Sequence, residues 1–280
     1  MLRAVDIRTI AATQGVDTGI IEKDYVLTKT LTVLAGDAAM TDALVFKGGT
    51  ALKKCYFPDW RFSEDLDFTS TVPLTAAAIM RNFARLAQGV IETFGVRMRV
   101  VEYSQYPGKG DTIVSAQLKL GYDGPLQKSS GQKNNIKVDL SFDESIVEAR
   151  QTLAVTSSYA DDSIASIPVY TLAEILAEKI RSILQRGKSR DFYDVWCLLK
   201  LYQDRFAIEA VWPIFVEKLE AKELRVPRSV EDFLLEARVS AARQFWEKGI
   251  AHQVSSLPDF DAVLLELRDL LTGFFGSHLI

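Results

Sequence analysis

Residues 46–68 read FKGGTALKKCYFPDWRFSEDLDF, and the interpretation of the whole chain starts from this stretch. If residues 61–68 form a strand, side chains two positions apart share one face of it. Asp65 and Asp67 then project together, while the leucine and phenylalanine that follow them point into the core. Two neighbouring carboxylates repel each other unless a cation lies between them. The pattern therefore predicts a strand that carries a cation-binding pair of carboxylates.

A glycine pair precedes this strand, between a short strand expected over residues 43–46 and a helix expected over residues 51–56. The backbone can approach a ligand closely at Gly48 and Gly49, and N–H groups at the start of a helix attract anions. A glycine pair alone is more often a tight turn. Its position upstream of Ser63 and the two aspartates favours phosphate binding, so we expect these residues to contact a triphosphate.

Further along, the hydrophobic pattern indicates a sheet. A helix is expected over residues 79–94, after which apolar residues alternate over residues 96–100, 114–120 and 136–142, as in half-buried strands. Asp139 lies in the middle of the last strand, on its polar face. A single aspartate on a solvent-facing strand is commonplace, but here it can supply a third carboxylate beside the first two.

The chain becomes helical from Thr171 to its end. A helix over residues 172–186 places Lys179 in the middle of its apolar stripe, so this lysine is predicted to point inward toward an anionic partner. Asp191 lies in the first turn of the next helix, where Ser189 can cap it and a carboxylate favours the helix dipole. Together with Arg190, it is predicted to belong to a charged cluster that faces a cleft.

The fold class predicted from these elements is α+β. It combines a mixed twisted sheet flanked by helices over residues 1–160 with a helical lobe over residues 161–280 that completes the cleft. The segment 121–135, rich in Gly, Lys, Ser and Asn, is expected to be a flexible hairpin loop. A chain of 280 residues with 48% hydrophobic content is long enough for two such lobes.

Composition excludes several classes of protein. The two cysteines and two histidines show no zinc-binding or disulfide pattern, and the N-terminal residues lack the apolar run of a signal peptide or membrane anchor, so we expect a cytoplasmic protein without a membrane partner. The net charge of −4 argues against a globally basic nucleic-acid-binding surface. A local strip is still allowed, and residues 181–190 are the candidate; the second basic segment, residues 218–228, is expected to be a solvated helix face.

Three carboxylates beside a glycine turn suit transfer of a nucleotidyl group with Mg²⁺, or Mn²⁺, as cofactor and a nucleoside triphosphate (NTP) as substrate. Asp65 and Asp67 are predicted to hold the metal, and Asp139 to complete the metal site or to accept the proton of the attacking hydroxyl. Lys179 and Arg190 are predicted to neutralise charge on the phosphates. The spacing alone is weak support, because an Asp-x-Asp pair occurs by chance roughly once in a chain of this length.

The segments FKGGTALKK and RFSEDLDF closely resemble the first motif of the AbiEii/AbiGii-type nucleotidyltransferase toxins, which include the mycobacterial MenT toxins, within the DNA polymerase β-like nucleotidyltransferase superfamily. IEKDYVLTKTL looks like the N-terminal helix of that family, and AEKIRSILQRGKSRDFYDV is similar to its later motif. The resemblance implies a bilobed fold. The functional residues that it implies are Gly48, Gly49, Thr50, Ser63, Asp65, Asp67, Lys179 and Asp191. We add Lys47 and Arg190 to these as predicted nucleotide-binding residues.

The resemblance also implies an activity. The expectation is a toxin of a toxin–antitoxin or phage-defence system, paired with a cognate antitoxin, that transfers a nucleoside monophosphate (NMP) from an NTP to RNA. The expected acceptor is the 3′ end of tRNA, so that translation is blocked. Asp139 matches only as an acid on the expected strand. Two alternatives stay open: a nucleotidyltransferase that modifies a small molecule or a protein, and a catalytically silent nucleotide-binding module.

One hypothesis concerns control of the site. Ser63 lies two residues before Asp65, so a phosphate on this serine would add about −1.5 to −2 charges beside the metal and the triphosphate and should silence the site.

Overall fold

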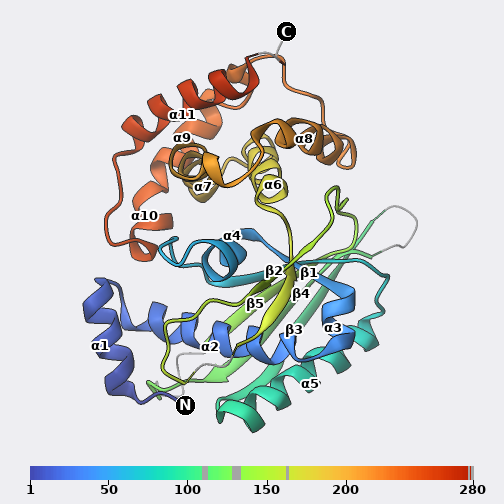
Figure 1. Cartoon of the computed structure of the whole chain (residues 1–280), viewed down its shortest axis with the longest axis vertical. Helices are drawn as coiled ribbons and strands as arrows, with labels where there is room; N and C mark the ends of the chain where they lie inside the picture. Colours follow the sequence, from blue (N-terminus) through green and yellow to red (C-terminus); the bar gives the residue numbers. More distant parts are fainter. Residues whose placement is uncertain (109–112, 128–133, 162–163, 277, 279–280) are drawn as a thin grey trace. The chain divides into compact units, whose positions relative to one another are not determined.

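A seven-stranded mixed sheet forms the centre of the chain up to residue 169 in this computed structural model, which describes residues 1–108, 113–127, 134–161, 164–276 and 278 (Figure 1). The strand order is β3-β4-β5-β2-β1-β7-β6. The strands are β1 (Leu44–Lys47), β2 (Asp65–Ser70), β3 (Arg97–Pro107), β4 (Ile113–Asp123), β5 (Asn135–Ser141), β6 (Gln151–Ala154) and β7 (Ser166–Val169).

The chain divides into two compact units. Unit 1 comprises Met1–Asp143 and Arg150–Val169, and unit 2 comprises Glu144–Ala149 and Tyr170–Ile280. The sheet belongs to unit 1 and the later helices to unit 2, so the predicted α+β class is confirmed. The predicted boundary after residue 160 falls inside unit 1, because β7 still pairs with β1. The assignment of the two lobes as functional domains stays a prediction.

Helices cover the apolar face of the sheet in unit 1. Helices α2 (Thr18–Ala35) and α5 (Ala76–Phe94) pack against each other, and α5 also packs against β3. The remaining helices of unit 1 are α1 (Ala4–Gln14), α3 (Ala38–Ala43) and α4 (Gly48–Ala51), which continues as a π-helical turn (Leu52–Tyr56).

The alternation predicted for the second strand is confirmed, but its start is corrected. Leu66 and Phe68 are fully buried, whereas Asp65 and Asp67 are half-buried. The strand begins at Asp65 rather than at residue 61, because pairing with β5 starts at Asp65 and pairing with β1 reaches only to Asp67. Residues 61–64 therefore lead into the strand without a neighbouring strand among the described residues.

Unit 2 is helical, as predicted, and its centre is α7 (Ser189–Leu201). Helix α7 contacts α6 (Leu172–Gln185), α9 (Glu236–Gln244), α10 (Trp246–Ile250) and α11 (Phe260–Phe275), while α8 (Val211–Glu220) packs on α6. No helix in the part of the chain that the structure describes is both long and apolar enough to cross a membrane.

Some local predictions differ from the structure. Lys188, not Ser189, is the N-cap residue of α7, and the Ser189 hydroxyl donates instead to the carbonyl oxygen of Ala242 at 2.9 Å. Strands β6 and β7 were not predicted, because a strand of four residues is too short to show an alternation of apolar and polar side chains. The predicted hairpin loop over residues 121–135 is shorter, since β4 extends to Asp123, and its residues 128–133 lie outside the described residues.

The inward-pointing Asp24 of α2 belongs to a buried cluster of polar side chains. Its Oδ2 lies 2.7 Å from the Nζ of Lys54 and accepts a hydrogen bond from the Tyr159 hydroxyl at 2.6 Å. Asp24 and Lys54 are at most 4% exposed. The ion pair and the hydrogen bond give this aspartate a structural role.

Removing the lysine of this cluster should destabilise unit 1. Lys54→Met leaves the buried Asp24 carboxylate without its cation, and we expect the free energy of unfolding to fall by about 3 kcal/mol in urea denaturation followed by tryptophan fluorescence. The double variant Asp24→Leu with Lys54→Met removes both charges and should recover most of that loss. A single variant as stable as the native chain would contradict the structural role of the pair.

Candidate active site

The pairing register of β2 gathers the predicted carboxylates on one face of the sheet. Asp67 is directly opposite Lys47 of β1 and directly opposite Asp139 of β5, and Asp65 is directly opposite Lys137. Side chains of directly paired residues project from the same face. Because the neighbouring residues on these strands are buried in the core, this face is the one turned away from α2 and α5.

A lysine that the sequence analysis did not select lies among these carboxylates. The Nζ of Lys137 is 2.6 Å from the Oδ2 of Asp139, whose Oδ1 accepts a hydrogen bond from the Gln117 amide at 2.9 Å. Partial burial works against the charge of Lys137, but the hydrogen bond to Asp139 and the negative charges of Asp139, Asp65 and Asp67 raise the pKa of its ammonium. Lys137 could have been found by its spacing, since it lies two residues before Asp139 on the same strand face.

The two glycines pack directly against this polar face. Gly48 has a φ of +80°, and a Cβ at this position would lie 2.5 Å from the Oδ2 of Asp67. A Cβ at Gly49 would lie 2.9 Å from the Nη2 of Arg61 and 3.2 Å from the Oγ of Ser63. The predicted proximity of the glycine pair, the serine and an aspartate is therefore present within unit 1. Arg61 joins them as a buried guanidinium that the sequence analysis did not select.

Two further predicted residues connect the glycine segment to the strands. The Thr50 hydroxyl donates a hydrogen bond to the carbonyl oxygen of Asp65 at 2.5 Å, which ties α4 to the start of β2. Lys47, at the end of β1, is buried and is 5% exposed. The hydrogen bond from Thr50 gives this residue a structural role in addition to its predicted contact with the nucleotide.

The carboxylates can be tested as a magnesium site. Among the described residues, no group of three or more His, Cys, Asp or Glu is arranged to hold a metal ion. Asp139 is bound by Gln117 and Lys137 and shares this face with Asp65 and Asp67, and its part in a metal site stays a prediction. Two carboxylates fit Mg²⁺, which usually takes one or two of them and completes its shell with water and substrate phosphates.

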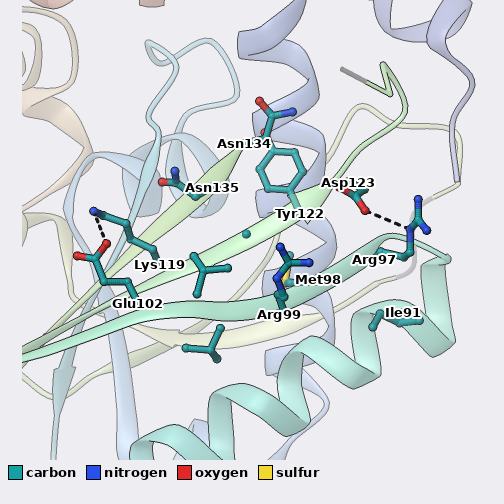
Figure 2. Close-up of a pocket in the computed structure, with 13 residues that line it drawn as sticks. Ile91, Arg97, Met98, Arg99, Glu102, Lys119, Tyr122, Asp123, Asn134 and Asn135 are labelled. Atoms are coloured by element: carbon teal, nitrogen blue, oxygen red, sulfur yellow. Dashed lines mark hydrogen bonds and ion pairs between the residues drawn. The ribbon is translucent and has the colours of Figure 1, made fainter. Parts of the chain in front are cut away.

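The same sheet face continues into a hollow of about 950 Å³ (Figure 2). Lys119 of β4 is directly opposite Lys137, and Gly121 is directly opposite both Asn135 of β5 and Arg99 of β3. Lys119, Gly121, Asn135 and Arg99 all line the hollow. It is therefore continuous, through the strand register, with the face that carries the carboxylates.

Lys179 and Asp191, the predicted functional residues of unit 2, have separate partners. The Nζ of Lys179 lies 2.7 Å from the Oδ2 of Asp194, which is fully buried. The predicted anionic partner of Lys179 is therefore confirmed, and it is Asp194 rather than Asp191. Asp191, 1% exposed, is bound by the Arg186 guanidinium at 2.9 and 3.0 Å. Arg190 is half-buried. A shared cleft with the carboxylates of unit 1 stays a prediction.

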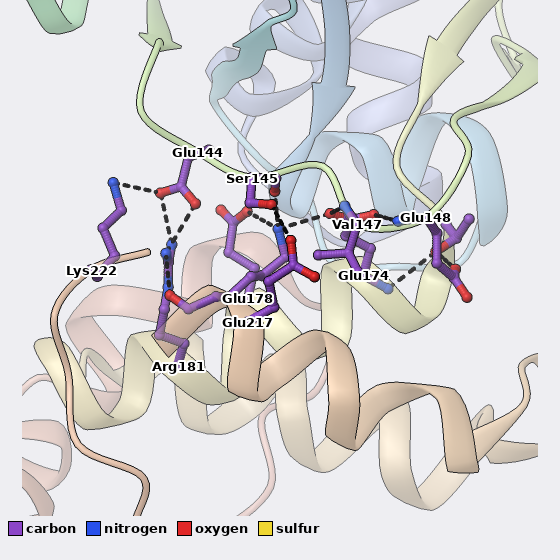
Figure 3. Close-up of polar contacts among 11 residues, drawn as sticks. Glu144, Ser145, Val147, Glu148, Glu174, Glu178, Arg181, Glu217 and Lys222 are labelled. Atoms are coloured by element: carbon purple, nitrogen blue, oxygen red, sulfur yellow. Dashed lines mark hydrogen bonds and ion pairs between the residues drawn. The ribbon is translucent and has the colours of Figure 1, made fainter. Parts of the chain in front are cut away.

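The predicted RNA-binding strip is corrected at its first residue. Both terminal nitrogens of Arg181 bind the carboxylate of Glu144 at 2.9 Å, and Arg181 is only 4% exposed (Figure 3). The solvated face predicted for the second basic segment is confirmed at Arg225 and Arg228, which are exposed, but not at Lys218, which is fully buried with its Nζ 2.9 Å from Glu174. Glu174 also accepts hydrogen bonds from the backbone N–H groups of residues 147 and 148. Arg181 and Lys218 therefore stabilise unit 2 and are not available to a nucleic acid.

Comparisons with known proteins bear on the family and the fold of the chain. The model of one protein family, described as the nucleotidyl transferase AbiEii toxin of type IV toxin–antitoxin systems, matches residues 32–266. Among solved structures, the chain is similar to MenT4, a nucleotidyltransferase toxin from Mycobacterium tuberculosis, with a TM-score of 0.68 and 19% sequence identity over 100% of this chain and 91% of that chain. At this identity the likeness shows the fold alone. No curated protein sequence matches the chain.

A matched pair of variants can separate the effect of the Gly48–Asp67 contact on nucleotide binding from the effect of backbone strain. Gly48→Ala and Gly95→Ala both place a side chain at a positive φ, which should cost about 1 kcal/mol of stability in each case. Only Gly48→Ala also displaces the Asp67 carboxylate, since a Cβ at Gly95 would meet nothing within 4 Å. We expect Gly48→Ala alone to weaken binding of an NTP with Mn²⁺ by about tenfold or more in calorimetry. Equal binding by the two variants would disprove the role of the contact.

Proposed function

Because the chain belongs to the AbiEii family of nucleotidyl transferase toxins of type IV toxin–antitoxin systems, as its sequence motifs predicted, it is a nucleotidyltransferase, and we propose that it transfers NMP from an NTP to RNA with Mg²⁺. The proposed acceptor is the 3′ end of tRNA, and the proposed consequence is a block of translation. The proposed setting is the cytoplasm, in a toxin–antitoxin or phage-defence system, with a cognate antitoxin as partner.

One observation carries the proposal: Asp65 and Asp67 lie on a single strand face, against a glycine pair that leaves room at Asp67. The two carboxylates would hold the magnesium ion, which, when bound, neutralises phosphate charge and lowers the pKa of an attacking hydroxyl. Gly48 and Gly49 begin α4, and the first N–H groups of a helix have no partner within it and favour phosphate. The buried Arg61 guanidinium beside Gly49 adds positive charge to this phosphate site.

In the proposed reaction a hydroxyl oxygen of the acceptor forms a bond to the α-phosphorus of the NTP. The bond from that phosphorus to the oxygen bridging to the β-phosphate breaks, and pyrophosphate leaves with the electron pair. The hydroxyl proton passes to a carboxylate of this sheet face, and Asp139 is proposed to accept it or to complete the metal site. Asp139 also binds the ammonium of Lys137 and so holds this lysine among the carboxylates.

Lys179, Arg190 and Asp191 are proposed to act in the same reaction, with the two cations neutralising charge on the phosphates. Lys179 and Asp191 also have structural partners in unit 2, Asp194 and Arg186. Replacing either residue leaves a partner charge unpaired, which destabilises a buried site. A loss of activity in such variants therefore has to be separated from a loss of folding.

The proposal predicts which molecules become labelled. Incubation with each α-labelled NTP, Mg²⁺ and total tRNA should place label in RNA with the native chain and with Asp204→Asn, a variant of an exposed aspartate. The isosteric Asp65→Asn should lower the rate by about 100-fold or more, because it removes a charge that acts on the reacting groups. Label on a small molecule or on a protein, with none in RNA, would identify a different acceptor, and no turnover would identify a silent nucleotide-binding module.

We also propose that a phosphate on Ser63 silences the site. Ser63 is 7% exposed and its Oγ faces Gly49, so a phosphate there would displace the glycine segment as well as add negative charge. Intact-mass analysis after coexpression with the antitoxin should show one added phosphate on the native chain and none on Ser63→Ala. An inactive but unmodified native chain would show that the antitoxin acts by occlusion instead.

A further inference from the structure

The hollow beside the carboxylates has the chemistry of a binding site for a nucleic-acid backbone. We propose that this hollow, between β3, β4 and the start of β5, binds the sugar–phosphate chain of the RNA acceptor next to its reacting end. The inference rests on the proposed function and adds to it the surface that recognises the acceptor.

The position of the hollow follows from the strand register. Asp65 on β2, Lys137 on β5 and Lys119 on β4 form one row across the sheet, and the next row along the strands contains Asn135, Gly121 and Arg99. Neighbouring strands are about 4.8 Å apart and a step of two residues covers about 6.7 Å. The row that lines the hollow thus begins at Asn135, roughly 8 Å from Asp65, and ends at Arg99, roughly 16 Å from it, distances that a short single-stranded segment can span.

The charges of the hollow are mostly basic side chains that phosphate can reach. Lys119 pairs with Glu102 at 2.8 Å, and Arg97 pairs with Asp123 at 3.2 Å (Figure 2). The side chains of both pairs are exposed, so each contact contributes little and a phosphate can compete for the cation. Arg99 lies between the two pairs and is exposed.

Arg99 is the strongest candidate for a phosphate contact. No carboxylate among the described residues forms an ion pair with it, and its guanidinium can bind a phosphate with two parallel hydrogen bonds. The hollow thus carries three cations against two carboxylates, in a chain whose net charge is −4. Such a local excess of positive charge suits a polyanion.

The shape of the hollow adds an apolar contact surface. A bulge in β3 between Val100 and Glu102 leaves Val101 as an extra residue, 48% exposed. A Cβ at Gly121 would lie 2.7 Å from the Cγ1 of Val101, so only the absence of a side chain at Gly121 lets the valine lie there. The alkyl group can pack on a ribose or base while the amide of Asn135 and the neighbouring cations bind polar groups. A free phosphate or a triphosphate alone would not need this surface.

Binding to a fluorescently labelled tRNA tests the proposal with the full chain. The measurements are fluorescence anisotropy over a series of salt concentrations and, in parallel, calorimetry of NTP binding. Arg99→Ala should weaken tRNA binding by about fivefold and lower the slope of log affinity against log salt by about one, as expected for the loss of one phosphate contact. NTP binding should be unchanged. Arg81→Ala, which removes an exposed arginine of α5, is the matched control and should bind tRNA like the native chain.

A second variant tests the shape rather than the charge. Gly121→Ala should displace Val101 and weaken tRNA binding while circular dichroism and NTP binding stay native. If the native chain labels and binds tRNA but Arg99→Ala and Gly121→Ala bind it like Arg81→Ala, the inference is wrong and the proposed function stands. If the native chain neither binds nor labels RNA, both are wrong.

Discussion

The candidate site depends on one constraint, the register in which β2 pairs with β1 and β5. This register sets Asp67 opposite Lys47 and Asp139, and Asp65 opposite Lys137. A shift of one residue would turn the carboxylates into the core and bring Leu66 and Phe68 to the surface, so burial of these apolar residues fixes the register. The hydrophobic core therefore determines where the charged face lies, and Lys137 offsets the repulsion among the carboxylates that results.

Charges inside the two units serve stability more often than chemistry. Asp24 with Lys54, Lys218 with Glu174, and Lys179 with Asp194 are each close ion pairs with at least one fully or almost fully buried partner. Removing water from such groups is costly, and each pair persists because the attraction and additional hydrogen bonds offset that cost. An inward-pointing charge on an amphipathic helix therefore predicts a partner reliably. It predicts a catalytic role only when a second observation, such as the family motif around Lys179, agrees with it.

The sequence was sufficient for most of the fold, because the helical and strand periods of unit 1 are long and regular. It also identified Gly48, Gly49, Ser63 and Asp67, which the structure brings together. It passed over Lys137, although the spacing from Asp139 places this lysine on the same strand face. It also missed Arg61, since a basic residue in a loop has no signature until its neighbours in space are known. The RNA strip failed at Arg181 for the same reason: Glu144 lies 37 positions earlier in the sequence, and no local pattern indicates that they pair.

The distribution of charge on the sheet face supports the proposal that an acidic chain acts on two anionic substrates, an NTP and RNA. The carboxylates of β2 and β5 form one end of this face, where the repulsion of a triphosphate has to be overcome by a cation. The cations at the other end, Lys119, Arg97 and Arg99, lie on β3 and β4, where little negative charge from the carboxylate pair reaches them in water. The separation is set by the order of the strands, because β5 with Lys137 lies between β2 and β4. Each end also contains charges of the opposite sign, Lys137 among the carboxylates and Glu102 and Asp123 at the hollow, and all of these are held in ion pairs.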